Sequence, residues 1–457
     1  MFLFRGGQGP DQTNQPTGAE YVANLVDRLT SSHIIDDRRD AIRTLKALGA
    51  KFRNEVAEHA INTHEKDRAS IVVALKTDAS DVELSAHCLE IFYNTIATNP
   101  EDLAEGCSPL TADKLDLYSD FMLTACPDVS PPESPVSMAL DMLDSYEFNV
   151  RWPAIRFITQ ILRVKVSQVQ QIILEKPMAI SHLIDILQDP REVIRNEGIL
   201  ALLELTRSSP AIQKIVVFEN TFDFLLQIIE QEGHSDGSVV VADCLNLMLQ
   251  LLADNTSNIG FFRENTFIPR LSPFFDMNHT GMATSENMEE GEGTANLKIN
   301  WNEKKIDNVI LMLSVVRAIV APTIAKNDCK ACQNVVRKSG LLPQLCGMLM
   351  ATGVPAPVLA ETISTVADTV RNNQENQDYL CTVAAPFQPP RPLVTVLLMS
   401  MINENQPLVL RLSILYCFQA LYGKNTAAQS KLVATLLPQQ GQTRQQQLSA
   451  GQLLHGG

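Results

Sequence analysis

Apolar residues recur at three- and four-residue spacing along most of the chain, a pattern that predicts amphipathic helices with one buried face each. The pattern is clearest in residues 189–229. There it predicts three consecutive helices, at residues 193–197, 199–205 and 212–218. The rest of the chain reads as further copies of this helical unit.

A short repeat in the sequence gives the period of these helices. The tetrapeptide ENTF at residues 219–222 returns 45 residues later at 264–267, and Arg151 lies 44 residues before its equivalent, Arg195. Self-similar helical units of this length are typical of armadillo and HEAT arrays, in which each repeat packs only on its neighbours. The sequence therefore predicts an all-α fold: an armadillo/HEAT-like right-handed superhelical solenoid of roughly 44–45-residue three-helix repeats.

Some positions between helices are expected to need a special backbone conformation. Asn220, Asn265 and Gly340 each fall at a corner, and Gly and Asn tolerate a positive φ best. Pro153 aligns with Glu197 of the next repeat. It is expected in the first turn of its helix, where proline is tolerated.

Changes in amino-acid composition divide the chain into three segments. Residues 1–18 predict a disordered arm, residues 19–437 the repeat array, and residues 438–457 a Gln-rich tail at which the chain is expected to be truncated. Within the array, the four prolines of residues 126–135 predict a loop. Residues 276–297 are acidic without Lys or Arg and predict an exposed, disordered insertion.

Net charge and cysteine usage exclude some functions. A net charge of −15 argues against nucleic-acid binding and against simple adsorption to anionic lipid. Nine scattered cysteines, an odd number, indicate reduced thiols in a cytosolic protein. No apolar run approaches the roughly 20 residues of a membrane span. A cytoplasmic, soluble protein is expected.

The chain shows no pattern of catalytic residues. It has no HExxH pair, Walker loop or GxGxxG, and Cys329 and Cys332 form a lone CxxC without a second metal-ligand pair. Two thiols near a helix start explain that motif more simply than a metal or redox site. The sequence therefore predicts a protein that is not an enzyme and binds no cofactor or metal.

Trp152 and two arginines are candidate partner-binding residues, because Trp and Arg dominate interface hot spots. Two roles are open for Trp152: it anchors a partner, or it packs between adjacent repeats. Two roles are also open for Arg151 and Arg195: they form a basic ladder on one edge, or they pair with carboxylates of adjacent repeats. An import-adaptor groove is disfavoured, since Glu204 and Gln160 stand where its repeated Asn would be and the Trp ladder is absent.

Several long strings resemble one family closely. IDDRRDAIRTLKAL, NVRWPAIRFITQIL, REVIRNEGILALLELTRSSPAIQKIVVFEN and LLMSMINENQPLVLRLSILYCFQ are similar to the head region of the general vesicular transport factor family, the Uso-type tethers. The resemblance covers residues 19–457. In full-length members a coiled coil and an acidic tail follow the head. This sequence shows neither.

The resemblance implies a cytoplasmic protein, peripheral on Golgi and ER–Golgi transport membranes, that tethers vesicles before fusion. It implies a Rab-type small GTPase, other Golgi tethers and SNARE proteins as partners, with a homodimer possible. Arg38, Arg39 and Arg411 lie in strongly similar stretches and are further partner-binding candidates. Charge reversal at Arg38 and Arg39 is expected to weaken partner capture and leave thermal unfolding nearly unchanged. The alternative is another armadillo adaptor, in signalling or adhesion.

Overall fold

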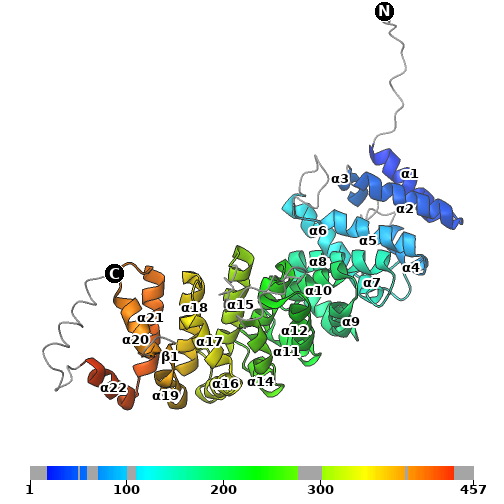
Figure 1. The fold of residues 1–457 in the computed structure, drawn as a ribbon. Coiled ribbons are helices and arrows are strands. Elements are labelled where there is room, and N and C mark those ends of the chain that lie inside the picture. The colour runs from blue at the N-terminus through cyan, green and yellow to red at the C-terminus, as the bar shows by residue number, and fades with distance from the viewer. Residues whose placement is uncertain are drawn as a thin grey trace, which may run out of the picture. The chain divides into compact units, whose positions relative to one another are not determined.

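A computed structural model describes residues 18–49, 52–58, 70–99, 110–275, 301–385 and 390–436. These residues belong to two compact units, Met1–Leu225 and Leu226–Gly457 (Figure 1). The predicted arm (except Gly18), the acidic insertion and the Gln-rich tail lie outside the described residues.

The first unit is a stack of helices. Its long helices α2, α5, α8 and α10 pack in that order, each against the next. The elements are α1 (Gly18–Ser31), α2 (Ile35–Gly49), α3 (Arg53–Val56), α4 (Ser70–Thr77), α5 (Val82–Ile96), α6 (Ala112–Leu123), α7 (Pro135–Met142), α8 (Phe148–Glu175), α9 (Ala179–Asp185), η3 (Ile186–Gln188), α10 (Glu192–Leu205) and α11 (Pro210–Phe218). Helix α12 (Thr221–Gln231) begins in the first unit and ends in the second.

The second unit repeats a long helix followed by two shorter ones, as in α18–α19–α20, and its long helices α13, α15, α18 and α21 again pack in order. The all-α armadillo-like fold class is therefore confirmed. The elements are η4 (His234–Asp236), α13 (Val239–Leu252), α14 (Thr256–Glu264), η5 (Ile268–Phe275), α15 (Glu303–Val320), α16 (Lys326–Lys338), α17 (Leu341–Met350), α18 (Ala356–Val370), α19 (Gln374–Thr382), β1 (Ala384–Ala385), β2 (Arg391–Pro392), α20 (Leu393–Ile402), α21 (Leu408–Tyr422) and α22 (Thr426–Leu436).

Two predicted helix boundaries are wrong. The helices expected at residues 193–197 and 199–205 are one helix, α10, which runs through Gly198. A Cβ at Gly198 would lie 2.5 Å from Cγ2 of Ile186, so the glycine permits close packing and does not break the helix. Pro153 is not in a first turn, because α8 begins five residues earlier, at Phe148.

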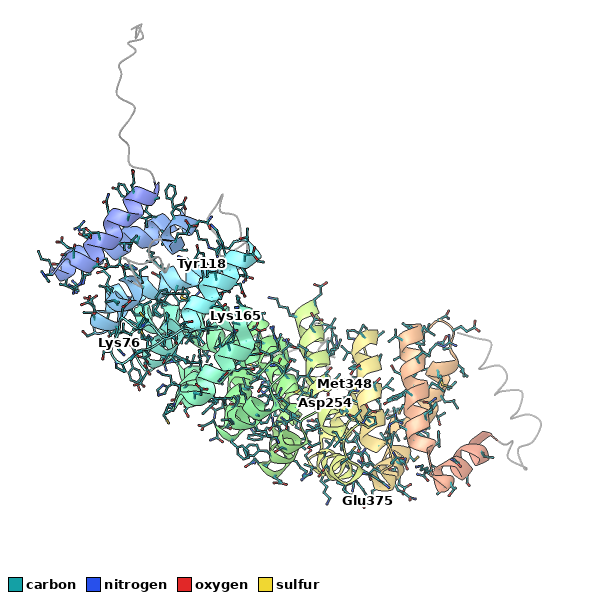
Figure 2. The ribbon with its side chains drawn as sticks, turned by 180° about the vertical axis from the view of Figure 1, so that it is seen from behind. Lys76, Tyr118, Lys165, Asp254, Met348 and Glu375 are labelled. Atoms are coloured by element: carbon teal, nitrogen blue, oxygen red, sulfur yellow. The ribbon has the colours of Figure 1, made fainter. Side chains whose placement is uncertain are left out.

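Helix α8 is itself two helices of one repeat. Its backbone leaves helical geometry at Lys165 (φ −132°, ψ 49°), which is labelled in Figure 2. The Lys165 ammonium lies 2.8 Å from the Asp120 carboxylate of α6 and also pairs with Asp116. Because of the bend at Lys165, α8 supplies both the first and the second helix of its three-helix repeat.

The corner positions are confirmed at two sites and shifted at the third. Asn220 and Gly340 have φ of 63° and 86°, as expected for residues that tolerate the left-handed region. Asn265 instead has φ −86°, and the positive φ of 60° falls on Thr266. The Asn265 backbone N–H and side-chain amide both donate to the Phe261 carbonyl, at 3.0 and 2.9 Å, so Asn265 caps α14 and the left-handed residue follows one position later.

Amide side chains bind the carbonyl groups that end several long helices. The donor lies seven residues after the acceptor, on the second helix of the same repeat. The four pairs are Gln213–Thr206, Asn258–Leu251, Asn376–Thr369 and Gln429–Tyr422, at 3.1, 2.8, 2.9 and 2.8 Å. Terminal carbonyls that have no partner within their helix are thereby satisfied.

A second set of amides joins each repeat to the next one. The second helix of one repeat donates to the end of the following long helix. The pairs are Gln170 to the Leu205 carbonyl, Gln333 to the Asp368 carbonyl and Gln377 to the Ala420 carbonyl, at 2.7, 2.7 and 2.9 Å. These bonds fix the spacing of neighbouring repeats in a way that apolar packing alone does not.

Replacing Asn376 with alanine is expected to lower the free energy of unfolding by about 1–3 kcal/mol. The buried Asn376 amide donates to the Gln333 and Thr369 carbonyls, at 3.1 and 2.9 Å, and both would lose this donor. Urea unfolding followed by circular dichroism measures the loss. The exposed neighbour Gln374 is the control, and its replacement should cost no more than about 0.5 kcal/mol. Equal losses for both variants would contradict a stabilising role for the amide.

Candidate partner-binding groove

The first unit contains a groove of about 780 Å³ between α2, α5 and the first turns of α8. One wall is charged: Arg39 and Lys46 come from α2, and Glu83 and Glu90 come from α5. The other wall is formed by four residues of α8, namely Phe148, Asn149, Trp152 and Pro153. Clefts of this size that combine apolar surface with a few polar groups are typical binding sites.

Ion pairs hold the charged wall together. Arg39 Nη2 lies 2.6 Å from Asp81 Oδ2, and Arg43 and Lys46 pair with Glu83 and Glu90 in the same way. Asp81 also caps α5, because its carboxylate accepts from the Leu84 N–H at 2.9 Å. Each cation of α2 therefore faces a carboxylate one repeat further along the chain.

A histidine lies between two of these carboxylates. His87 Nδ1 is 3.1 Å from Glu90, and its Nε2 is 3.7 Å from Glu83. The hydrogen bond from Arg43 lowers the pKa of Glu83 despite some burial. Burial alone would raise the pKa of Glu90, but hydrogen bonds from His87 and Lys46 lower it on balance. Both carboxylates are therefore ionised at neutral pH.

Rings and guanidinium groups form a continuous stack behind the α8 wall. The guanidinium carbon of Arg156 lies 4.0 Å from the Tyr93 ring centroid and 4.8 Å from that of Trp152. Trp152 stacks on Phe148 at 5.7 Å between ring centroids, and Arg191 lies 5.7 Å from Phe148. Because cation–π contacts hold the rings on both sides, Trp152 is oriented before any partner arrives.

Two of the predicted residues meet in this groove. Arg39 and Trp152 line opposite walls. Arg38 lies beside Arg39 on α2, but its guanidinium donates to Asp78 at 2.6 and 2.9 Å. Arg411 is in the second unit, where its Nε donates to the Met401 carbonyl at 2.9 Å. Arg411 therefore belongs to a different compact unit from the other candidates.

Arg151 and Arg195 converge on one residue. Arg151 is 7% exposed and its Nη1 lies 2.7 Å from Asp189 Oδ2, while Arg195 Nη1 lies 3.4 Å from the Asp189 carbonyl. The exposed basic ladder considered above is therefore wrong at Arg151, and pairing with a carboxylate between repeats describes it. Because the Arg151 guanidinium is buried and already paired, it contributes to the stability of the fold and is a poor contact for a partner.

Sequence reasoning missed Lys46, His87, Glu90, Phe148 and Arg156. The charged members had a detectable signal: each α2 cation pairs with a carboxylate about one repeat later, 42 residues from Arg39 to Asp81 and 40 from Arg43 to Glu83. Oppositely charged residues that lie about one repeat length apart in the sequence predict such ion pairs. The aromatic stack had no comparable signal, because it joins residues at unrelated spacings.

The described residues outside the groove offer little further chemistry. Cys329 and Cys332 lie in the first turns of α16, and burial raises the pKa of Cys329 to about 11 and also raises the pKa of Cys332. In the described ranges no group of three or more His, Cys, Asp or Glu side chains could hold a metal ion. Over the same part of the chain, no helix combines the length and apolarity needed to cross a bilayer.

Solved structures place this architecture in a class. The crystal structure of Uso1-2 matches with a TM-score of 0.78 at 23% identity, covering 94% of this chain and 64% of that one. The crystal structure of Uso1-1 matches similarly, with a TM-score of 0.76. A family model described as "Armadillo tether-repeat of vescicular transport factor" matches residues 298–358. The chain therefore has the armadillo-repeat fold.

Curated relatives narrow the class to one family. The human general vesicular transport factor p115 is 44% identical over 458 residues, which is all of this chain and 44% of that protein. USO1, the intracellular protein transport protein of Saccharomyces cerevisiae, is 26% identical over 81% of this chain and 20% of its own length. The chain belongs to the p115/Uso1 family of general vesicular transport factors. It spans less than half the length of these curated relatives.

Proposed function

We propose that the chain is the head of a vesicle tethering factor in ER-to-Golgi and intra-Golgi transport. It acts as a non-enzymatic scaffold in the cytoplasm and binds a Rab-type small GTPase. The observation that carries the proposal is the 44% identity, over the whole chain, to a protein named as a general vesicular transport factor. Other Golgi tethers, SNARE proteins and a second copy of the chain are further partners, and association with Golgi and transport membranes is peripheral, through proteins.

The groove between α2, α5 and α8 is the proposed docking surface for the GTPase. It combines a prearranged Trp152 with Arg39 at an accessible surface, and Trp and Arg are the residues that most often dominate binding energy. Phe148 beside them is 39% exposed, which leaves apolar area for a partner to cover. Arg195 and Arg411 remain secondary candidates for contact with other partners, whereas Arg151 is buried and paired with Asp189.

A pull-down with GTP-loaded and GDP-loaded early-secretory Rab proteins tests the proposal. We expect the GTP form to be recovered preferentially, and Trp152→Ala to reduce its recovery at least about tenfold, as for a hot-spot residue. Glu375→Gln on α19 is the control, because Glu375 is an exposed residue of the second unit (labelled in Figure 2), and it should bind as the unaltered chain does. Equal, negligible recovery of both nucleotide forms would exclude a GTP-selective site in this chain.

The structure changes what to expect of charge reversal on α2. Arg39→Glu should weaken capture, because Arg39 lines the groove, but it also breaks the pair with Asp81 and should lower thermal stability. Arg38→Glu is no longer expected to leave thermal unfolding unchanged, since it would place two carboxylates together where Arg38 now binds Asp78. Arg38 variants therefore cannot separate binding from folding, and thermal unfolding of the Trp152→Ala chain must accompany its binding measurement.

A further inference from the structure

An exposed tyrosine lies next to the groove, in the loop that precedes α8. Tyr146 is 85% exposed, and Phe148, two residues later, is 39% exposed and lines the groove. Phe148 in turn stacks on Trp152, with 5.7 Å between the ring centroids. Three aromatic side chains therefore follow one another where α8 begins, and we call Tyr146, Phe148 and Trp152 the aromatic row.

Two arginines hold the outer end of this row. Arg191 Nη1 donates to the Tyr146 carbonyl at 3.0 Å, and the Arg191 guanidinium carbon lies 5.7 Å from the Phe148 ring centroid. The Arg151 guanidinium carbon lies 5.9 Å from the Tyr146 ring centroid. Both ring contacts are within cation–π range. The backbone at Tyr146 and the two outer rings therefore each have a partner within the chain.

Both arginines are themselves fixed by one buried carboxylate. The Asp189 side chain is 0% exposed and accepts from Arg151 Nη1 at 2.7 Å. Arg191 donates to the same carboxylate through Nε and Nη2, at 2.8 and 2.7 Å, which is the two-pronged geometry that suits a guanidinium. Because Asp189 orients both guanidinium groups, it also orients the contacts that these groups make with the aromatic row.

An exposed ring that is already held in place is suited to binding a partner. Immobilising a free side chain costs conformational entropy, and contacts within the chain lower that cost before a partner arrives. A single exposed tyrosine would need no explanation. Tyr146 differs from Tyr21, which is 51% exposed on α1 and has no cation–π contact among the described residues. Tyrosine is also one of the residues that most often dominate binding energy.

We propose that Tyr146 is a second anchor of the docking surface, covered by the same partner that covers Trp152, and that Arg191 is its positioning residue. This inference rests on the proposed function, because the partner that it names is the GTP-loaded Rab-type GTPase. The partner follows from continuity of the surface. Phe148 belongs both to the groove wall and to the aromatic row, so a protein that packs on Phe148 and Trp152 is brought next to Tyr146.

Binding of GTP-loaded early-secretory Rab proteins to single variants tests the anchor. We expect Tyr146→Ala to weaken binding about tenfold, and Tyr146→Phe, which keeps the ring, to stay within about twofold of the unaltered chain. Because Tyr146 is so exposed, Tyr146→Ala should shift the thermal unfolding temperature by no more than about 2 °C. Tyr21→Ala is the matched control and should change neither quantity. Binding by Tyr146→Ala that equals binding by this control would overturn the inference.

Hydroxyl-radical footprinting of the complex tests the contact directly. Tyr146 is expected to be oxidised at least about threefold more slowly when the Rab protein is bound, whereas Tyr21 keeps its rate. A change in stability alone would not produce this difference between two exposed tyrosines of one unit. Equal oxidation of Tyr146 with and without the partner would show that the partner does not cover it.

A double-variant cycle tests the positioning role of Arg191. Arg191→Met removes the hydrogen bond to the Tyr146 carbonyl and the contact with Phe148, and it should weaken binding about threefold. In the Tyr146→Ala background the further loss should be clearly smaller, because part of what Arg191 positions is gone. Fully additive losses would contradict a role of Arg191 through Tyr146.

Failure of the inference and failure of the proposed function give different results. Recovery of GTP-loaded Rab that Trp152→Ala reduces and Tyr146→Ala leaves intact would keep the GTPase and overturn the inference. Negligible recovery by the unaltered chain would remove the proposed GTPase, and the partner named for Tyr146 would fall with it.

Discussion

Replacing Asp189 with alanine is expected to lower the free energy of unfolding by about 3–5 kcal/mol, the cost of breaking a buried ion pair by removing one partner. Asp189 is 2% exposed and accepts from Arg151 Nη1 at 2.7 Å. Arg191 donates to the same carboxylate through Nε and Nη2, at 2.8 and 2.7 Å. The variant leaves the buried Arg151 guanidinium without its carboxylate.

Urea unfolding of the Asp189→Ala chain measures this loss. Asp185 lies four residues earlier and is exposed, so Asp185→Ala is the matched control, with an expected change within about 0.5 kcal/mol. Adding Arg151→Met should recover part of the stability, because an apolar side chain of similar length removes the unpaired charge. A loss no larger than that of the control would show that the Asp189 pairs contribute little.

The same carboxylate predicts a pH dependence. Burial would raise the pKa of Asp189, but hydrogen bonds from Arg191 and the charges of Arg191 and Arg151 lower it on balance. A folded-state pKa below the unfolded value means that the stabilisation is complete above about pH 4 and is lost as the pH falls through the folded pKa. The difference between the unaltered chain and Asp189→Ala should therefore shrink on acidification and remain constant between neutral pH and pH 5.

Periodicity predicted the helices well where burial alone determines them. The helix expected at residues 212–218 lies within α11, Pro210–Phe218. The periodicity prediction failed at Gly198, because a glycine can either end a helix or let a neighbouring helix approach closely. Only the position of Ile186 in the structure decides between these two roles. The prediction failed by one residue at Asn265, where the backbone N–H still bonds the Phe261 carbonyl four residues earlier, and the left-handed residue is Thr266.

The groove was partly predictable. Trp152 was proposed from residue type and Arg39 from the family resemblance of its stretch, and both line the groove. Opposite charges one period apart could have identified Glu83 and Glu90 as well. Stacking of Arg156 between Tyr93 and Trp152 depends on how α5 packs against α8, and the sequence pattern does not determine the relative rotation of two helices.

Replacing Asp368 with alanine is expected to destabilise the second unit by about 3–5 kcal/mol. Asp368 on α18 is 2% exposed and accepts from Arg317 Nε of α15 at 3.0 Å. Its other oxygen accepts from the Tyr416 hydroxyl of α21 at 2.5 Å. One carboxylate therefore joins three consecutive long helices, and its loss removes the Tyr416 contact at one interface and leaves Arg317 with Glu361 alone at the other.

Glu361, a more exposed carboxylate on the same helix, provides the matched control for this buried contact. Glu361 pairs with the same Arg317 at 2.7 Å, but its side chain is 24% exposed, so Glu361→Ala should cost only about 1 kcal/mol or less. Hydrogen exchange locates the effect: because repeats stabilise only their neighbours, Asp368→Ala should speed exchange in α15, α18 and α21 while the first unit keeps its protection. Equal losses for the two variants would mean that Arg317, and not the buried carboxylate, holds these helices together.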